Sequence, residues 1–313
     1  MGHPRPFRFG VQLANARDAA EWAALARKAE DLGYSTLFMP DHFDDILAPL
    51  PGLMAAADAT SSLRIAPLVL DNDYKHPVVT AKELATLDLL SDGRLEVGIG
   101  AGWMASDYEQ SGIPMDPPGM RVDRLEEAVA ILKGLFAEGT VDFAGEHYTI
   151  TGLDGRPKPV QQPHPPFLIG GAQPRLLRFA AQEADIIGVN PAIKKGRVGA
   201  DASRDGMAAR TDEKLAWVRE AAGARYDEIE INFLIFACMV TDDRQGTLET
   251  MAPLFALTPE EVGEYPHAWI GSVEEICDKL EAGRERWDAS YLVVQGVDAL
   301  EAAAPIVARL AGT

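Results

Sequence analysis

The segment LATLDLLSDGRLEVGIGAGW, residues 84–103, contains a helix pattern, a break and a strand pattern in immediate succession. The apolar helical periodicity ends at Ser91-Asp92-Gly93, and a short strand is predicted to follow at 94–99. This strand continues into Gly98-x-Gly100-x-Gly102. Glycine at alternate positions removes side chains where the backbone approaches a flat or charged group, more often a ligand than a second backbone. Tight packing at the end of a barrel strand is the alternative, and the spacing differs from the dinucleotide fingerprint G-x-G-x-x-G.

The same alternation of strand and helix patterns extends through the chain. The predicted strands are 7–13, 35–39, 63–70, 94–99, 167–169, 185–189, 229–240 and 291–294. The predicted helices are 18–32, 50–59, 77–90, 121–137, 174–183, 273–286 and 298–310. Eight strands alternating with helices predict an α/β fold, a (β/α)8 TIM barrel formed as a single domain over residues 1–313.

Three segments are longer than a barrel loop requires and are interpreted as insertions near 138–166, 191–212 and 258–271. The first has the pattern of a hairpin with its turn at 144–146. The second is polar and is interpreted as a lid or insertion.

Composition excludes several classes of partner. The chain has 29 basic and 48 acidic residues, a net charge of −19, which argues against nucleic acid and against anionic membrane surfaces. Two cysteines cannot form a disulfide framework and favour a reducing, cytoplasmic location. The N-terminal residues lack the apolar region of a signal peptide, and no apolar run is long enough for a membrane span.

In a TIM barrel the active site lies where the strands end at their carboxyl termini. This rule selects Gln12 and Asn15, Asp41 and His42, residues 68–73, 98–103 and 170–172, and Asn190. His42 directly follows the second strand and is the best-placed group for proton transfer; a histidine that anchors the loop is the alternative. Asp41 either orients His42 or caps the following segment.

Gly170 and Gly171 precede the helix predicted at 174–183, and free N–H groups at a helix N-terminus attract phosphate. A tight turn is the alternative. Basic residues follow in the sequence and are either part of an anion site or a solvated face: Arg175, Arg178, Lys194, Lys195 and Arg197.

Other chemistries lack their motifs. Asp71-x-Asp73 with His76 does not match an EF-hand loop, and the chain has no paired His or Cys spacing, so no metal is predicted. The sequence contains neither a G-x-S-x-G elbow nor a Walker loop. None of the predicted strands carries a lysine for a Schiff base, which disfavours an aldolase.

Four segments resemble the bacterial luciferase-like (luciferase-like monooxygenase) family over essentially the whole chain. They are FMPDH at 38–42, APLVLDNDYKHPVVTAKELATLDLLSDGRLEVGIGAGW at 66–103, PVQQPHPPFLIGGA at 159–172 and ADIIGVN at 184–190. Within the family, the chain is most similar to the oxidoreductases that use the deazaflavin coenzyme F420 in place of FMN.

The resemblance implies roles for individual residues. Family members have a non-prolyl cis peptide behind the isoalloxazine ring, which by position falls near Leu68-Val69. His42 inherits a proton-transfer or ring-contact role, with Asp41 beside it. The implied cofactor-binding residues are Leu68, Val69, Asp71, Ala101, Gly102, Trp103, Gly170, Gly171, Ala172 and Asn190. Trp103 stands where the sugar-phosphate dehydrogenases of the family have a proton-donating glutamate, which argues against glucose 6-phosphate as substrate.

The function implied is hydride transfer between C5 of coenzyme F420 and a small organic substrate, which the insertion at 191–212 would cover. An FMNH2-dependent monooxygenase of the same family is the alternative. The anionic tail of coenzyme F420 requires cations, for which Lys75, His76 and Lys194 are candidates, whereas FMN requires none of them. A barrel that binds flavin without catalysis is a third interpretation. Family habit favours a homodimer.

Overall fold

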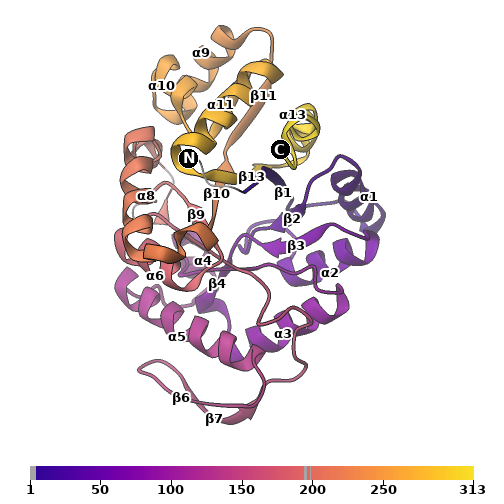
Figure 1. Cartoon of the computed structure of the whole chain (residues 1–313), viewed down its shortest axis with the longest axis vertical. Helices are drawn as coiled ribbons and strands as arrows, with labels where there is room; N and C mark the ends of the chain where they lie inside the picture. The colour runs from indigo at the N-terminus through magenta and orange to yellow at the C-terminus, as the bar shows by residue number, and fades with distance from the viewer. Residues whose placement is uncertain (1–4, 194–195, 198) are drawn as a thin grey trace.

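The central element of the fold is a parallel β-barrel, visible in Figure 1 as strands enclosed by helices. The computed structural model describes residues 5–193, 196–197 and 199–313. Within them, one nine-stranded sheet has the order β3-β2-β1-β13-β10-β9-β8-β5-β4. Its strands are β1 Arg8–Gln12, β2 Thr36–Met39, β3 Arg64–Pro67, β4 Leu70–Asp71, β5 Val97–Gly100, β8 Phe167–Gly171, β9 Ile186–Val189, β10 Glu230–Ile235 and β13 Ala289–Gln295.

The two ends of this sheet meet and close the barrel. β3 and β4 are consecutive halves of one barrel strand, separated by Leu68 and Val69. A bridge from Ile65 to Leu95 joins β3 to the segment that leads into β5, and β4 pairs with β5 directly. The prediction of an α/β fold with a (β/α)8 TIM barrel is therefore confirmed.

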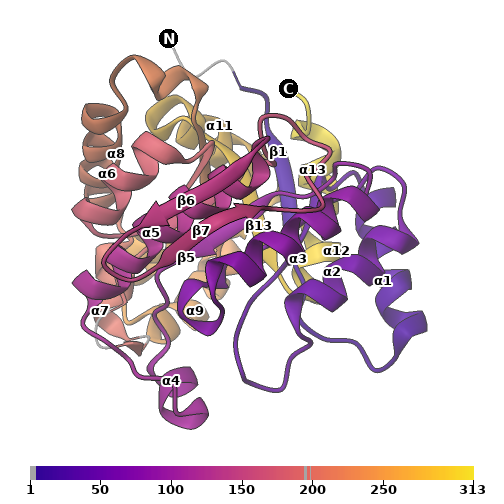
Figure 2. The same ribbon diagram turned by 90° about the horizontal axis from the view of Figure 1, so that it is seen from below.

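The helices lie around the barrel and at its ends, as Figures 1 and 2 show from two directions. They are α1 Ala19–Asp31, α2 Pro49–Ala59, α3 Pro77–Leu90, α4 Ala105–Ser111, α5 Pro118–Phe136, α6 Pro174–Glu183, α7 Ala200–Asp205, α8 Ala208–Ala222, α9 Arg244–Phe255, α10 Pro259–Glu264, α11 Val273–Trp287, α12 Val297–Ala302 and α13 Ala304–Leu310. The predicted bounds 77–90 and 174–183 agree with α3 and α6, since each helix begins at a proline that needs no N–H there.

The barrel lumen is filled by side chains and is a packed core. Its six buried members come from five strands: Phe38, Ala66, Leu168, Ile186, Tyr291 and Val293. A buried ion cluster lies where the strands begin: Glu96 accepts from Arg8 at 2.7 Å and from Arg64 at 2.9 Å. Burial alone would raise the pKa of Glu96, but the two arginines hold it below its usual value. This end of the barrel serves stability.

The predicted strand 63–70 is divided into β3 and β4, and the helices α4, α7, α8, α9 and α10 were not predicted. Two further predicted elements are also divided. The apolar run 229–240 is two strands, because β11 (Ala237–Val240) leaves the barrel and pairs with β12 (Ala268–Gly271) in a separate sheet. β11, α9 and α10 lie at the top of Figure 1, and with β12 they enclose a small core of their own. The predicted helix 298–310 is divided into α12 and α13, because Pro305 cannot donate an N–H to a continuing helix.

The hairpin predicted around 144–146 is present as β6 (Thr140–Ala144) and β7 (Thr149–Asp154), and projects from the barrel in Figure 1. Its turn is held by a hydrogen bond of 2.9 Å from Gly145 N to Tyr148 O. Over the described ranges, none of the helices combines the length and the apolar character needed to cross a membrane.

Candidate active site

The carboxyl ends of β2, β4 and β5 bring the predicted site residues into one mouth. Met39 O accepts a hydrogen bond from Leu68 N at 2.7 Å, and the Asp41 carboxylate accepts one from Asp71 N at 3.0 Å. Asp71 in turn pairs with Gly100 at the end of β5. Residues from three neighbouring strands are thus joined by direct contacts at one edge of the barrel.

The cis peptide that the family resemblance implied is present between Leu68 and Val69 and is not a proline bond. The Gln12 side chain donates a hydrogen bond of 3.0 Å to Leu68 O, and both residues of the cis bond pack against the lumen core. Asn15 likewise donates to Asp45 O at 2.9 Å. Gln12 and Asn15, both selected by position, hold the backbone of the mouth.

The alternating glycines of β5 make room for the protein itself. A Cβ atom at Gly98 would lie 1.9 Å from Pro67 O, and one at Gly100 would lie 2.8 Å from a methyl group of Val69. At Gly102, which has a φ of 72°, it would lie 2.3 Å from the Asp71 carboxylate. The glycines therefore accommodate the broken strand β3–β4. These contacts fit the tight-packing alternative, and ligand binding at Gly102 stays a prediction.

His42 is oriented by Asp107 of α4, which the sequence reasoning missed. Nδ1 of His42 lies 2.7 Å from an Asp107 oxygen, and the Asp107 side chain is only 2% exposed. The Tyr74 hydroxyl donates to the same oxygen at 2.9 Å, and Phe43 N donates to the other at 3.2 Å. An ionised carboxylate only accepts, so Nδ1 carries the proton and Nε2 of His42 is left as the basic nitrogen.

Asp41 therefore does not have the orienting role that was one of its two predicted roles. Its carboxylate fixes the backbone of Asp71 instead. Trp103 meets the other side of His42, with ring centroids 5.5 Å apart and the rings nearly perpendicular. The histidine is thus held between a buried carboxylate and an aromatic edge.

A second carboxylate network lies beside the first. The Tyr108 hydroxyl donates to Asp71 at 2.9 Å and to Asp73 at 3.1 Å, and Arg124 forms two hydrogen bonds with Asp73. The pKa of Asp71 is raised to about 6, chiefly by burial and also by the neighbouring Asp73 and Asp41 charges. Burial also raises the pKa of Asp41.

Arg121 of α5 is another residue that sequence reasoning missed. Its guanidinium is buried and donates to the backbone carbonyls of Ala101 and Gly102 and to Asp116 O. It fixes the Ala101–Gly102–Trp103 turn from behind. Gly196 covers this turn from the other side, because a Cβ there would lie 2.5 Å from Trp103 O. Part of the 191–212 insertion therefore lies against the mouth.

The remaining predicted residues lie on the β8–β9 side of the mouth. β8 extends through Gly171, so Gly170 and Gly171 are strand residues that pair with Gly188 and Val189, and Ala172 follows in the bend before α6. The Asn190 amide lies over Gly170 and Gly188, where Cβ atoms would come within 3.2 Å and 3.4 Å of Nδ2. Oδ1 of Asn190 is buried with no hydrogen-bond partner. An unsatisfied amide above two glycines fits a polar planar ligand.

The N-terminus of α6 is compatible with an anion next to this cradle. Its N-cap residue, Gln173, makes no side-chain hydrogen bond to the first turn. The N–H groups of Arg175 and Leu176 are therefore free of helical partners. This geometry is compatible with the predicted phosphate position at 170–172. Gly170 and Gly171 themselves belong to strand β8 and not to a loop before the helix.

The basic residues considered for an anionic tail are engaged where the structure describes them. Lys75 pairs with Glu83 at 2.7 Å, and His76 accepts from Val78 N as the N-cap of α3. Arg197 pairs with Glu109, and Arg178 with Glu220, each at 3.2 Å. Lys194 and Lys195 lie outside the described residues.

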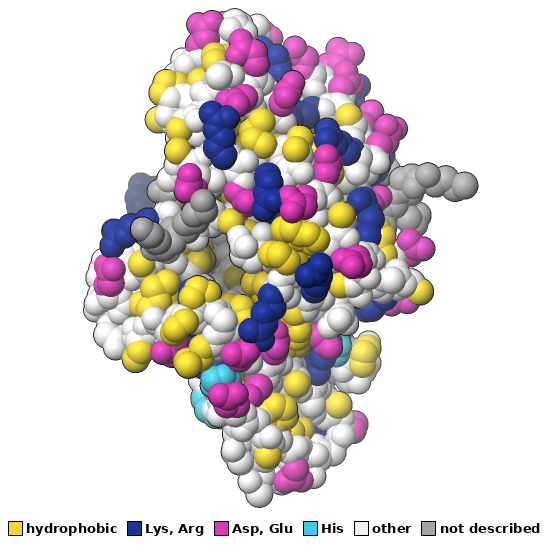
Figure 3. All heavy atoms as spheres, turned by 90° about the vertical axis from the view of Figure 1, so that its left-hand side faces the viewer, with side chains coloured by type: hydrophobic (Ala, Val, Ile, Leu, Met, Phe, Trp, Pro, Cys, Tyr) yellow, Lys and Arg dark blue, Asp and Glu magenta, His cyan; other side chains and the backbone are white. Residues whose placement is uncertain are grey.

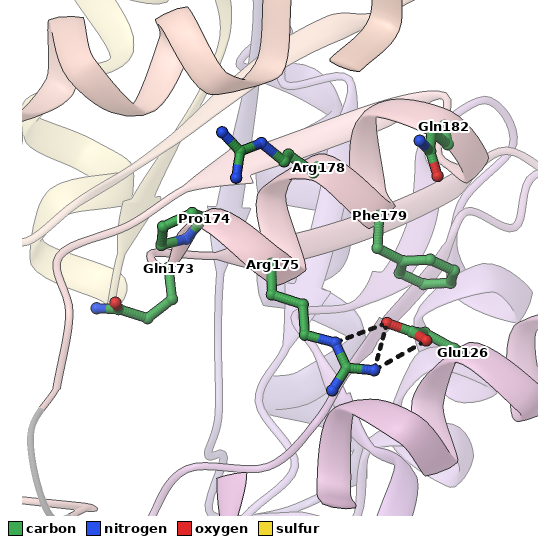
Figure 4. A pocket seen from close by; sticks show the side chains of 7 residues that line it. All are labelled: Glu126, Gln173, Pro174, Arg175, Arg178, Phe179 and Gln182. Atoms are coloured by element: carbon green, nitrogen blue, oxygen red, sulfur yellow. Dashed lines mark hydrogen bonds and ion pairs between the residues drawn. The ribbon is translucent and has the colours of Figure 1, made fainter. Parts of the chain in front are cut away.

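An open groove lies outside the barrel, along α6 (Figure 4). Arg175 spans it and binds Glu126 of α5 at 3.0 Å, while Arg178 points away from that pair. Figure 3 faces this side of the molecule and shows basic and acidic side chains interspersed. The charges along this groove are paired and face solvent. The polar contacts of the candidate site lie at the mouth of the barrel and not in this groove.

Comparisons with known proteins find relatives with two different cofactors. The chain is 27% identical over 232 residues to the F420-dependent glucose-6-phosphate dehydrogenase of Amycolatopsis mediterranei, covering 72% of this chain and 65% of that protein. It is also 27% identical over 190 residues to the FMNH2-dependent dimethylsulfone monooxygenase of Pseudomonas putida, covering 61% and 49%.

Among solved structures, the coenzyme F420 dependent tetrahydromethanopterin reductase of Methanopyrus kandleri superposes with a TM-score of 0.78 at 18% identity, over 98% of this chain and all of that one. The model of the family described as luciferase-like monooxygenase matches residues 1–300. The chain therefore belongs to the luciferase-like monooxygenase family.

Proposed function

We propose that this oxidoreductase transfers a hydride between coenzyme F420 and a small organic alcohol or carbonyl compound. The observation that carries the proposal is the His42–Asp107 pair at 2.7 Å in the barrel mouth. Interconversion of an alcohol and a carbonyl must move a proton as well as a hydride. A histidine held in one tautomer by a buried carboxylate provides a group for that proton.

His42 would act through Nε2. With Nδ1–H directed at Asp107, Nε2 takes the proton from a substrate hydroxyl during oxidation and returns it to the oxygen during reduction. Asp107 stabilises the charged imidazole while the proton is held. The buried Arg121 holds the Ala101–Gly102–Trp103 turn, and this turn places Trp103 beside His42.

The cradle residues would hold the cofactor. When bound, coenzyme F420 supplies the carbon that gives or accepts the hydride. Leu68 and Val69 would support one face of the ring, and Asn190 would hydrogen bond its polar edge. The phosphate would lie at Gly170–Ala172, near the free N–H groups of α6.

FMN is the second candidate cofactor, and one observation favours it. The described basic residues Lys75, Arg178 and Arg197 are each paired with a carboxylate, whereas the tail of coenzyme F420 adds several negative charges. An FMNH2-dependent monooxygenase would need only the phosphate site. The relatives named above include both chemistries.

The test is anaerobic hydride exchange between coenzyme F420 and a panel of alcohols and ketones, followed by deazaflavin absorbance. His42→Ala should lower kcat by about 10²- to 10⁴-fold while leaving cofactor affinity within a few-fold. Asp107→Asn should lower kcat less and shift the pH profile, and Tyr74→Phe, which leaves the pair intact, should lose less than about tenfold. Unchanged turnover in His42→Ala would show that the proton is handled elsewhere.

A further inference from the structure

We infer that the substrate of this mouth is an uncharged organic alcohol or carbonyl compound, and that compounds bearing a carboxylate or a phosphate are rejected. This inference rests on the proposed function and names its substrate class. It follows from the charges of the mouth, the partners of those charges and the apolar side chains beside His42.

The mouth is lined by four carboxylates, Asp41, Asp71, Asp73 and Asp107, here called the mouth carboxylates. Asp71 and Asp107 are buried, and a further negative group beside His42 would face them with little intervening water. Like charges brought together in such a site disfavour binding strongly.

The cations near the mouth already have hydrogen-bond or ion-pair partners. Arg124 is bound to Asp73 and Asp116 at 2.8 and 2.6 Å, and the buried Arg121 donates to backbone carbonyls. Lys75 and Arg197, in the loops around the mouth, are paired with Glu83 and Glu109. Over the described part of the chain, an anionic substrate would have to break one of these pairs before a cation became available.

The apolar side chains beside His42 fit an uncharged body. Phe43, which is 50% exposed, lies with its ring centroid 4.6 Å from that of Tyr74, and Tyr74 is bound to Asp107. Trp103 touches His42 on the other side. Phe43, Tyr74 and Trp103 are the aromatic neighbours of the proton-transfer group. Such rings bind hydrocarbon by burial, and the Tyr74 hydroxyl already donates to Asp107.

The first test measures the charge of the mouth without any cofactor. The chain has five tryptophans, so the emission of Trp103 is obtained by subtracting the fluorescence of a Trp103→Phe variant from that of the parent protein. At low salt, the Trp103 signal should be quenched by caesium and by neutral acrylamide, and several-fold less by iodide. Equal or stronger quenching by iodide would overturn the inference, whatever the activity of the enzyme.

The second test compares matched ketones, acetophenone and 4-acetylbenzoate, in the F420-loaded enzyme. The neutral ketone should have a kcat/KM higher by about tenfold or more. Glu83→Gln and Glu109→Gln, which free Lys75 and Arg197, should narrow that gap several-fold. Glu301→Gln, which frees Lys28 on the outer helices, should leave it unchanged.

The outcomes separate the two proposals. Preference for 4-acetylbenzoate that disappears in a Lys194→Ala/Lys195→Ala variant would overturn the inference and leave hydride transfer established. Failure to bind coenzyme F420 would overturn the proposed function, while the quenching measurement would still decide the charge of the mouth.

Discussion

At the scale of single residues, Gly102 illustrates how the backbone of the site is held. Its φ of 72° is one that side chains disfavour, and a Cβ would collide with the Asp71 carboxylate and the Tyr108 hydroxyl. Gly112 has a similar φ of 76° but nothing within 4 Å of a Cβ. An alanine at Gly112 would therefore meet only the unfavourable backbone conformation, whereas an alanine at Gly102 would also collide with neighbouring atoms.

Gly102→Ala is therefore expected to be much more harmful than Gly112→Ala. The second substitution should lower the free energy of unfolding by about 1 kcal/mol, the cost of a left-handed alanine. The first should cost about 3 kcal/mol or more, because two buried polar groups must also move. Urea denaturation of both variants measures the difference, and equal losses would show that the turn relaxes without cost.

Asp71 makes stability depend on pH. Burial raises its pKa in the folded protein to about 6, above the ordinary value of an unfolded chain. The folded state therefore favours protonated Asp71, and this contribution is present below the unfolded pKa and is lost as pH rises through about 6.

Asp71→Asn removes this titration. From about pH 4 to about pH 7, the free energy of unfolding of the parent should fall by on the order of 2 kcal/mol more than that of the variant. The lost hydrogen bonds from Tyr108 affect the variant equally at both pH values. Urea denaturation at the two pH values provides the measurement, and parallel pH dependences would contradict the assignment.

The position of His42 after a strand was enough to select it from the sequence, but its partner Asp107 could not be predicted. Asp107 is 65 residues away and reaches His42 only because α4 follows β5 over the mouth. The glycines of β5 were recognised as special, although their cause is the neighbouring strand. Contacts between distant segments have no local signature, which is why these interpretations were incomplete.

At the scale of elements, α8 holds the insertion to the barrel through Lys214. The Lys214 side chain is 1% exposed, donates to Asn190 O and Asp205 O at 2.9 Å each, and pairs with the Asp205 carboxylate. Ala192 N donates to the same carboxylate at 2.7 Å. These contacts fix both ends of the segment 190–205 beside the mouth.

Lys214→Met should consequently destabilise the protein by about 3 kcal/mol, because it leaves buried carbonyls and a carboxylate without their donor. Arg210→Met removes an exposed partner of the same Asp205 and should cost less than about 1 kcal/mol. Urea denaturation and the rate of protease cleavage within 190–207 report the two effects. Similar losses in both variants would show that Lys214 does not anchor this segment.

Local signals also explain which elements were predictable. Prolines at 77 and 174 start α3 and α6, and these helices were predicted to the residue. The run 229–240 is mostly apolar, and nothing in it marks the break at Phe236, whose N–H donates to His267 O at 2.8 Å. That break is set by a segment thirty residues later, so periodicity alone predicted one strand.

At the scale of the whole molecule, the fold and the net charge restrict where an anionic cofactor can bind. A closed barrel presents a single mouth at the carboxyl ends of its strands, and there the site combines a cis bulge, a histidine–carboxylate pair and an amide cradle. The net charge of −19 leaves little surface that would attract large anions nonspecifically. Binding of an anionic cofactor must therefore depend on this local cradle.

Titration of the purified protein with oxidised coenzyme F420 and, separately, with FMN, followed by tryptophan fluorescence, tests this account most directly. Trp103 lies in the mouth, so a bound ring should quench it. The account predicts a Kd for coenzyme F420 of about 1 μM or below and an affinity for FMN weaker by about tenfold or more, with both lost in Gly102→Ala. Tighter binding of FMN would contradict it and would make the chain an FMN-dependent member of its family.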